Sequence, residues 1–143
     1  WRDVSLADLR NHEGRLPEVL QRRARHVVTE SSRTREAAEE LRTGNPAALG
    51  PLMAASHQSL RDDFEVSCAE LDLMVQLASD IGPAGGLLGS RMTGGGFGGS
   101  TVSLCRSEQL TEIAACLAMG YERETGLAPQ LFSTRPAGGA RLL

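Results

Sequence analysis

A run of glycines in the second half of the chain is the feature that points most directly to chemistry. The run from Gly94 to Gly99 holds only one residue with a side chain, Phe97. Glycine has no Cβ atom and readily takes positive φ, so such a loop can bring several backbone N–H groups close to a ligand. Clustered N–H donors suit an anion such as a phosphate, and the alternative is a flexible hairpin tip.

The spacing of these glycines excludes two familiar phosphate-binding motifs. It fits neither the dinucleotide-binding fingerprint nor the Walker pattern, because no Lys follows the run and the chain contains none. Residues 87–93 and 101–105 flank the loop and are predicted to be strands. A second glycine-rich stretch, 82–90, closes a predicted helix and leads into a strand. A phosphate cradle should instead open a helix, so we interpret this stretch as a connector.

Charged residues near the loop allow more than one interpretation. Arg91 could offset phosphate charge, but pairing with a carboxylate is the stronger interpretation. The turn Arg61, Asp62 and Asp63 is either an exposed connector or faces a cleft, and the sequence favours neither. A role for Asp62 or Asp63 as a general base is the weakest interpretation.

Three further features receive a structural interpretation. The cluster Arg22, Arg23 and Arg25 is expected to be a solvated helix face rather than a phosphate site. His57 lies at the edge of an apolar stripe and is expected to be partly buried and hydrogen-bonded. Phe97 is expected to plug the core and so hold the loop.

The first two thirds of the chain have helical patterns. Apolar or small residues recur at three- and four-residue spacing after Pro17, and Gly44 is expected to end that helix. Predicted helix starts are a capping box at Ser5 and Asp8, an N-cap at Asn45 before Pro46, and a capping box over Ser67–Glu70. The last of these helices is expected to end at Gly82.

The C-terminal third combines strands with one helix. Ser107 is predicted to cap a helix that ends at Gly126. Strands are expected at 130–133 and 140–143, with a turn at Gly138 and Gly139 between them. Helices followed by strand, loop, strand, helix and strand give an α+β fold whose tail is half of a split βαβ, ferredoxin-like antiparallel unit.

Bulk properties narrow the class of protein. The 143 residues suit a single domain, and the net charge of −3 gives no basic field for nucleic acid. Cys68, Cys105 and Cys116 lack metal-ligand spacing and suggest buried free thiols in a reducing compartment. No stretch has the length of a membrane helix, and no signal peptide is visible. Because the chain begins at Trp1, we interpret it as a piece of a longer protein.

Two segments carry a resemblance to a known family. The segment Gly89–Val102, read GSRMTGGGFGGSTV, resembles the third signature of galactokinases, within the GHMP family of small-molecule kinases. The segment Ser56–Asp72, read SHQSLRDDFEVSCAELD, resembles the galactokinase helix and turn just upstream. Residues 2–6 and 22–28 match in the same order, so the resemblance covers nearly the whole chain. Ser100 stands where relatives also have cysteine, which is a small change.

The resemblance implies that residues 1–143 form the C-terminal domain of a galactokinase. Such a parent is a cytoplasmic enzyme that uses ATP and Mg²⁺ to phosphorylate the anomeric hydroxyl of galactose. Its catalytic aspartate and main ATP loop lie upstream, so no catalytic residue or metal ligand is expected here, and the fragment alone should be inactive. The expected partners are galactose, ATP and the N-terminal domain, which supplies a strand to the sheet. The residues expected near substrate or phosphate are Thr93, Gly94, Gly95, Gly96, Gly98, Gly99 and Ser100, with Arg61, Asp62 and Arg91 as candidates that face the cleft.

Three interpretations stay open at this stage. The favoured one is a fragment of a galactose kinase. The second is an N-acetylgalactosamine kinase or a catalytically silent galactose sensor with the same fold. The third is an independent α+β ligand-binding module, which would need a self-contained sheet. The sequence does not decide sugar preference or oligomeric state.

Overall fold

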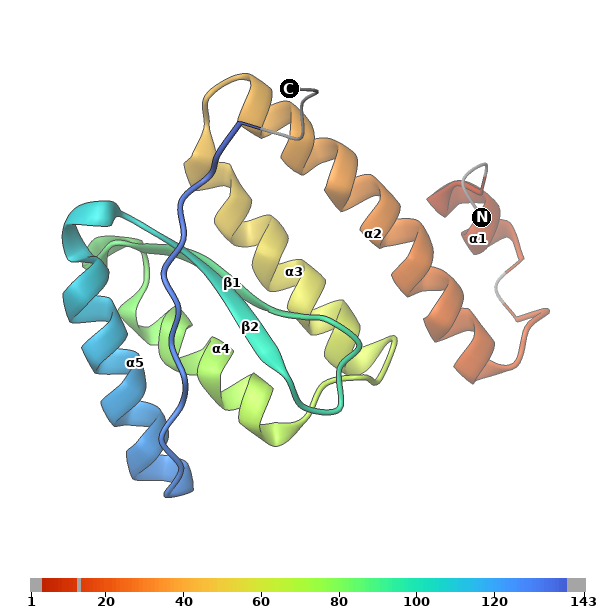
Figure 1. The fold of residues 1–143 in the computed structure, drawn as a ribbon. Coiled ribbons are helices and arrows are strands. Elements are labelled where there is room, and N and C mark those ends of the chain that lie inside the picture. The colour runs from red at the N-terminus through yellow and green to blue at the C-terminus, as the bar shows by residue number, and fades with distance from the viewer. Residues whose placement is uncertain (1–3, 13, 139–143) are drawn as a thin grey trace, which may run out of the picture.

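The computed structural model describes residues 4–12 and 14–138, which form helices and one β-hairpin (Figure 1). In chain order the elements are α1 (Leu6–Asn11), α2 (Glu18–Arg42), the 3₁₀ turn η1 (Pro46–Ala48), α3 (Leu49–Asp62), α4 (Ala69–Ile81), η2 (Pro83–Gly85), β1 (Leu87–Thr93), β2 (Ser100–Cys105), η3 (Ser107–Gln109) and α5 (Leu110–Thr125). The predicted mixture of helices and an antiparallel sheet is confirmed.

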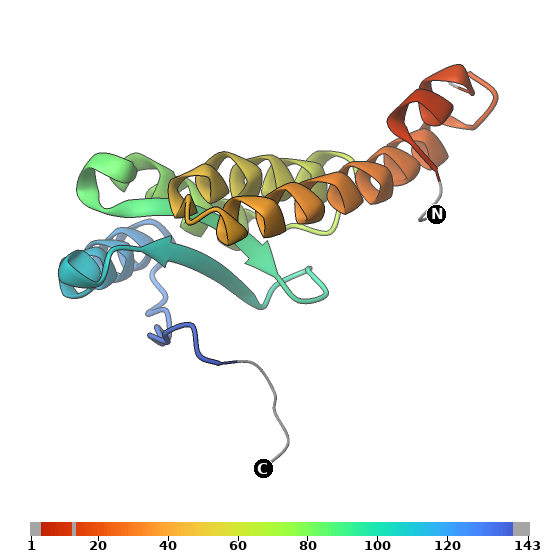
Figure 2. The same cartoon turned by 90° about the horizontal axis from the view of Figure 1, so that it is seen from above.

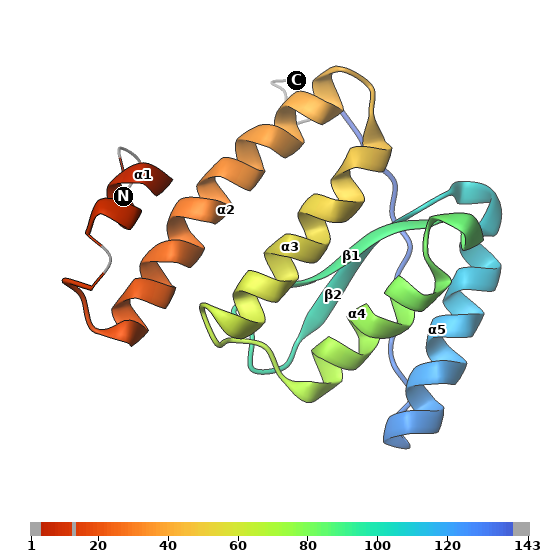
Figure 3. The same ribbon diagram turned by 180° about the vertical axis from the view of Figure 1, so that it is seen from behind.

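The helices form a layer behind the hairpin. Seen from behind, α1 to α5 follow one another side by side, with the strands beyond α3 and α4 (Figure 3). Seen from above, α2, α3 and α4 lie on one side of the hairpin, and the segment after α5 passes on the other side (Figure 2). The hairpin therefore has a helix-covered side and a side that these helices leave open.

The α2–α3 contact is small and polar, as the pattern of α2 predicted. Ala24 and Val28 are buried on α2, and Ser56 and Ser59 are buried on α3. The Ser56 hydroxyl donates to Glu30 Oε2 (2.7 Å), so a carboxylate of α2 is satisfied within the contact. Small side chains let the helices approach, and hydrogen bonds replace part of the apolar packing.

Strand β1 pairs antiparallel with β2 from Leu87↔Cys105 to Thr93↔Ser100, with an irregularity between Leu87 and Gly89. Helix α3 crosses β1 at very close range. A Cβ atom on Gly50 would lie 2.0 Å from the Leu88 carbonyl oxygen, and one on Gly89 would lie 2.7 Å from Gly50 Cα. These two glycines therefore bring the backbones of α3 and β1 together, which sets the position of the strand that leads into the glycine loop.

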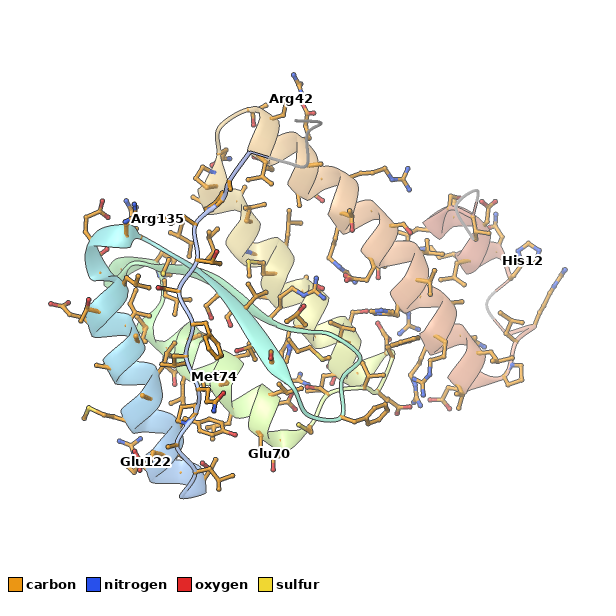
Figure 4. The ribbon with its side chains drawn as sticks, viewed as in Figure 1. His12, Arg42, Glu70, Met74, Glu122 and Arg135 are labelled. Atoms are coloured by element: carbon orange, nitrogen blue, oxygen red, sulfur yellow. The ribbon has the colours of Figure 1, made fainter. Side chains whose placement is uncertain are left out.

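Two apolar clusters fix the hairpin to the helices. One joins α4, β1 and α5 and contains Met74, Ala78, Leu87, Ile113 and Leu117. The other joins α3, α4 and the end of β1 through Leu60, Leu71 and Met92. Glu70 on α4 and Glu122 on α5 extend to the surface, away from Met74 (Figure 4). Met92, two residues before the loop, is fully buried.

Predicted helix starts were only partly correct. The Ser5–Asp8 capping box is confirmed, but Asn45 makes no side-chain cap; its amide donates to Glu40. Cys68, with extended backbone, is the N-cap of α4, and Ser67 instead donates its hydroxyl to Asp72. The Ser67–Glu70 capping box was therefore wrong.

The start of the last helix also differs from the prediction. A 3₁₀ turn follows Ser107, and α5 begins at Leu110 without a side-chain cap. The predicted helix ends at Gly44, Gly82 and Gly126 are confirmed, and all three glycines have positive φ. The 82–90 stretch is a connector through η2 into β1, as expected.

The predicted strand at Gln130–Ser133 was wrong, because these residues have no regular structure and pair with no strand. Phe132 is 88% exposed. Among residues 4–12 and 14–138 the only strand pair is β1 with β2, so Gln130–Ser133 lacks the inter-strand hydrogen bonds that define a strand, and the other edge of β2 stays unpaired. Gly138 is irregular, and the predicted 140–143 strand and the rest of the turn lie outside the described residues.

Candidate functional site

The glycine loop connects β1 and β2 and forms the turn of the hairpin (Figure 1). Its ends are fixed by the Thr93↔Ser100 pair, and both of these residues are exposed. The residues with positive φ are Gly94, Gly96, Phe97, Gly98 and Gly99. Most of this conformation is accessible to glycine and costly for other residues, which explains the composition of the loop.

One side of the loop is pinned and the other is open. A Cβ atom on Gly96 would lie 2.1 Å from the Val66 carbonyl oxygen. That oxygen accepts the Phe97 N–H at 2.7 Å, so the connection between α3 and α4 holds the middle of the loop. Cβ atoms on Gly94, Gly95, Gly98 and Gly99 would meet nothing within 4 Å.

The open side offers backbone donors. Within the described part of the chain, the N–H groups of Gly94, Gly95, Gly98 and Gly99 donate to no backbone or side-chain acceptor. Successive N–H groups in backbone of this kind can form an anion-binding concavity. The loop can therefore offer hydrogen bonds to phosphate or hydroxyl oxygens, and no side chain on those glycines blocks the approach.

Phe97 does not plug the core, so that expectation was wrong. It is 77% exposed, and its φ of +58° turns the backbone at the tip of the loop. The buried anchor is instead Met92, and the contact that holds the tip is a backbone hydrogen bond to Val66. Sequence reasoning missed Val66, because a carbonyl acceptor leaves no signature in residue type.

Arg91 does not pair with a carboxylate, which corrects the favoured expectation. Its Nε donates to the Met92 carbonyl oxygen at 2.9 Å, and no acidic side chain of the described residues lies within ion-pair distance. Its positive charge helps to lower the pKa of His57 and that of Glu30, although burial dominates the first. Arg91 therefore contributes charge to the region between the loop and α2.

Arg61 and Asp62 pair with each other at the end of α3. Arg61 Nε lies 2.8 Å from Asp62 Oδ1, and each side chain is about half exposed, at 47% and 51%. The Arg61 hydrogen bond is the largest of the effects that lower the pKa of Asp62. The lowered pKa makes Asp62 a weaker base, and its carboxylate is already paired with Arg61, so the geometry does not favour Asp62 as a general base. Asp63 instead pairs with Arg25 at 2.9 Å.

The arginine cluster of α2 is not simply a solvated face. Arg22 and Arg23 both bind the carboxylate of Glu65, and Arg23 also donates to the Asp63 carbonyl. Glu65 has a φ of +59°, an unusual conformation for a residue with a side chain. These ion pairs hold the α3–α4 connection whose next residue, Val66, contacts the loop. Partners some 40 residues away could not be read from the spacing.

A shallow hollow of about 640 Å³ lies elsewhere, along α2. Its lining includes His26, Glu30, Thr34 and Phe64, and His26 stacks on Phe64 with ring centroids 4.5 Å apart. The glycine loop does not line this hollow, so the candidate site is an exposed loop and not an enclosed pocket. Among the described residues, no group of three His, Cys, Asp or Glu side chains could hold a metal ion.

Residues 37–122 match the family described as GHMP kinases C terminal, and this chain belongs to that family. A curated galactokinase of Chloroflexus aggregans is 50% identical over 138 residues, which are 96% of this chain and 35% of the relative. A galactokinase of Pasteurella multocida is 46% identical over 136 residues, 92% of this chain and 34% of the relative. The chain thus spans about a third of the length of the curated relatives it matches.

A solved structure agrees with these matches. The crystal structure of Lactococcus lactis galactokinase complexed with galactose superposes with a TM-score of 0.82 at 35% identity, over 88% of this chain and 32% of that chain. The resemblance to galactokinases is therefore supported by both sequence and fold. In the part of the chain that the structure describes, no helix is long and apolar enough to cross a membrane.

Proposed function

We propose that this chain is the C-terminal part of a galactokinase, which transfers the γ-phosphate of ATP to the anomeric hydroxyl of galactose. The observation that carries the proposal is the glycine loop. Its sequence resembles a galactokinase signature, and its open side presents backbone N–H groups with no acceptor among the described residues. The curated galactokinases at 46–50% identity support the same conclusion.

The role proposed for this chain is positioning and electrostatic stabilisation. Phosphoryl transfer requires little covalent chemistry from the protein, and aligned donors and charges supply most of the catalysis. The N–H groups of Gly94, Gly95, Gly98 and Gly99 would donate to a phosphate or sugar oxygen, between the hydroxyl groups of Thr93 and Ser100. The hydrogen bond from the Phe97 N–H to the Val66 carbonyl oxygen would hold the tip of the loop, and Gly96 leaves room for this close approach.

Other groups have less direct roles in the proposal. Arg91 would add positive charge near the loop, and the Arg61–Asp62 pair would face the cleft at its rim. ATP with Mg²⁺ supplies the phosphoryl group and its charge neutralisation. The open glycine positions fit an anionic group, but no Mg²⁺ ligand is assigned to the described residues. The proposal also assigns the general base to the N-terminal domain of the parent.

A cytoplasmic location for the parent belongs to the same proposal. Cys68, Cys105 and Cys116 are all free thiols, but they are not buried as expected: Cys68 and Cys105 are half-buried and Cys116 is exposed. Unpaired cysteines fit a reducing compartment, where ATP-dependent sugar kinases work. An N-acetylgalactosamine kinase or a silent sensor would share this location and fold, so only substrate turnover separates them.

The direct test is ADP formation by the full-length protein and by this chain alone. With ATP and Mg²⁺, we expect galactose-dependent turnover by the full-length protein and none above a no-protein control by the 143-residue chain. Galactose and N-acetylgalactosamine are compared at equal concentrations, with glucose as the control sugar. Faster turnover of N-acetylgalactosamine than of galactose would mean that the protein is an N-acetylgalactosamine kinase. No turnover of any sugar by the full-length protein would favour the catalytically silent sensor. Turnover by the 143-residue chain alone would make Asp62 and Asp63 candidates for the general base.

A further inference from the structure

His57 connects helix α3 to the last residues before the glycine loop. It is 5% exposed, and its Nδ1 accepts the Met92 N–H at 3.2 Å. Met92 is fully buried, and only Thr93 separates it from the loop. The hydrogen bond therefore holds the entry of the loop by a side chain from another element.

The hydrogen bond sets the protonation state of the ring. An imidazole nitrogen that accepts an N–H must carry a lone pair, so the proton of the neutral ring is on Nε2. Nε2 lies 3.2 Å from Asp72 Oδ1, outside good hydrogen-bond geometry. That oxygen also accepts the Ser67 hydroxyl. Asp72 thus attracts the Nε2 proton through its charge and favours this tautomer.

Charges from three elements surround the ring. Asp72 faces it from α4, Arg91 from β1, and Arg61 and Asp62 from its own helix. Burial is the largest effect and lowers the pKa of His57 below its ordinary value of 6.5, while Asp72 opposes that change. The neutral ring is therefore the form present at neutral pH. A second proton would bind Nδ1 and turn this acceptor into a donor. The Met92 N–H would then face another N–H group, and the hydrogen bond would be lost.

The loop has a second anchor on the same helix. Val66, whose carbonyl oxygen holds Phe97, donates its own N–H to the Leu60 carbonyl oxygen at 3.0 Å. Leu60 lies one turn after His57 on α3. Both the entry and the tip of the loop are thus positioned by α3, the entry through His57 and the tip through Val66 and Leu60. A shift at either anchor changes the direction of the loop N–H groups.

We propose that His57 is a positioning residue of the candidate kinase site, which aligns the glycine loop through the Met92 amide and does so only as the neutral Nε2–H tautomer. This inference rests on the proposed function. It predicts that kcat/KM falls as pH drops through the lowered pKa of His57, on the acid side of its ordinary value, because the ring then binds its second proton.

The test compares two substitutions in the full-length protein. In His57→Asn, the side-chain oxygen can replace Nδ1 as acceptor but cannot be protonated at these pH values. We expect kcat/KM for galactose within about threefold of wild type at pH 8, and the ratio of variant to wild type to rise as pH falls from 8 to 5. His57→Leu removes the acceptor and should lower kcat/KM at pH 8 about 10- to 100-fold, because small misplacements of aligned groups are costly.

His26→Asn is the matched control. His26 is also a buried histidine with a lowered pKa, but its ring hydrogen bond is to Ser59 on α3 and not to the backbone of β1. His26→Asn should therefore show the same fall in kcat/KM at acid pH as the wild type. A ratio of His57→Asn to wild type that stays constant with pH would overturn the proposal, as would a folded His57→Leu variant with normal kcat/KM.

A second measurement keeps the proposal testable if His57→Leu does not fold or if the parent has no kinase activity. Long-range ¹H–¹⁵N spectra of the labelled full-length protein report which ring nitrogen carries the proton. We expect Nε2–H for His57 at neutral pH, and a change in the Met92 and Gly94 amide shifts as His57 titrates. An Nδ1–H tautomer, or loop amides that do not respond, would overturn the proposal whatever the substrate proves to be.

Discussion

A full-length protein carrying Gly95→Val is expected to lose about 100-fold in kcat/KM while its stability is almost unchanged. Gly95 does not have positive φ, and a Cβ atom there would meet nothing within 4 Å, so neither strain nor a clash disfavours the folded state. The branched side chain would instead occupy the open side of the loop and block the approach of a ligand. A ligand displaced by about 1 Å from its reactive position loses about 100-fold in rate. The free energy of unfolding should change by no more than about 0.5 kcal/mol.

Two neighbouring glycines supply matched controls. Gly96→Val would drive a side chain into the Val66 carbonyl group and should lower both activity and melting temperature. Gly98→Val would block the same open side and would also strain the backbone, because the φ of Gly98 is +122°, so it should lower both activity and melting temperature. Steady-state kinetics measured beside thermal melting separates Gly95→Val from these two variants. Near-normal kcat/KM in folded Gly95→Val would mean that the loop is a structural hairpin tip and not a ligand site.

The 143-residue chain alone is expected to be marginally stable and prone to self-association. The second edge of β2 is unpaired among the described residues, Val102 on that strand is 47% exposed, and Phe132 is 88% exposed. Leu88 and Leu104 are only half-buried. A fully buried large apolar side chain contributes roughly 1.5–3 kcal/mol, and a domain is stable by about 5–15 kcal/mol in total. Lack of cover for three such residues therefore removes much of the usual stability.

Chemical denaturation at several protein concentrations, with size-exclusion chromatography, measures this instability. We expect a transition that depends on concentration and sharpens when the separately expressed N-terminal half of the parent is added. A charged substitution at the exposed strand, Val102→Glu, is the control and should reduce self-association. A monomer with a sharp transition at all concentrations would instead favour a complete, independent module.

Local patterns predicted most of the helices and the hairpin. The predicted 87–93 strand agrees with β1, and Gly44, Gly82 and Gly126 end their helices because glycine takes the positive φ that a helix end requires. These features depend on residues close together in the chain, which is why the sequence reveals them. His57 was expected to be partly buried and hydrogen-bonded; the hydrogen bond is confirmed, but the side chain is almost fully buried and its partner Met92 could not be read from local spacing.

The errors concern features that depend on distant partners. The 130–133 segment alternates like a strand, but a strand is defined by its pairing, and this segment pairs with neither strand of the hairpin. Phe97 looked like a core residue by type, yet the tip of the loop is held through its backbone. Arg22 and Arg23 gain their role from Glu65, far along the chain, and no local pattern could predict that pairing.

The most direct test of the central claim is a crystal structure of the full-length protein with galactose, Mg²⁺ and a non-hydrolysable ATP analogue. The quantity to measure is the distance from the loop nitrogens to the nearest ligand oxygen. We predict that at least one N–H group among Gly94, Gly95, Gly98 and Gly99 donates to a sugar or phosphate oxygen at about 2.7–3.2 Å. An ordered loop with every one of these nitrogens bonded to protein or solvent, and none to either ligand, would contradict the account.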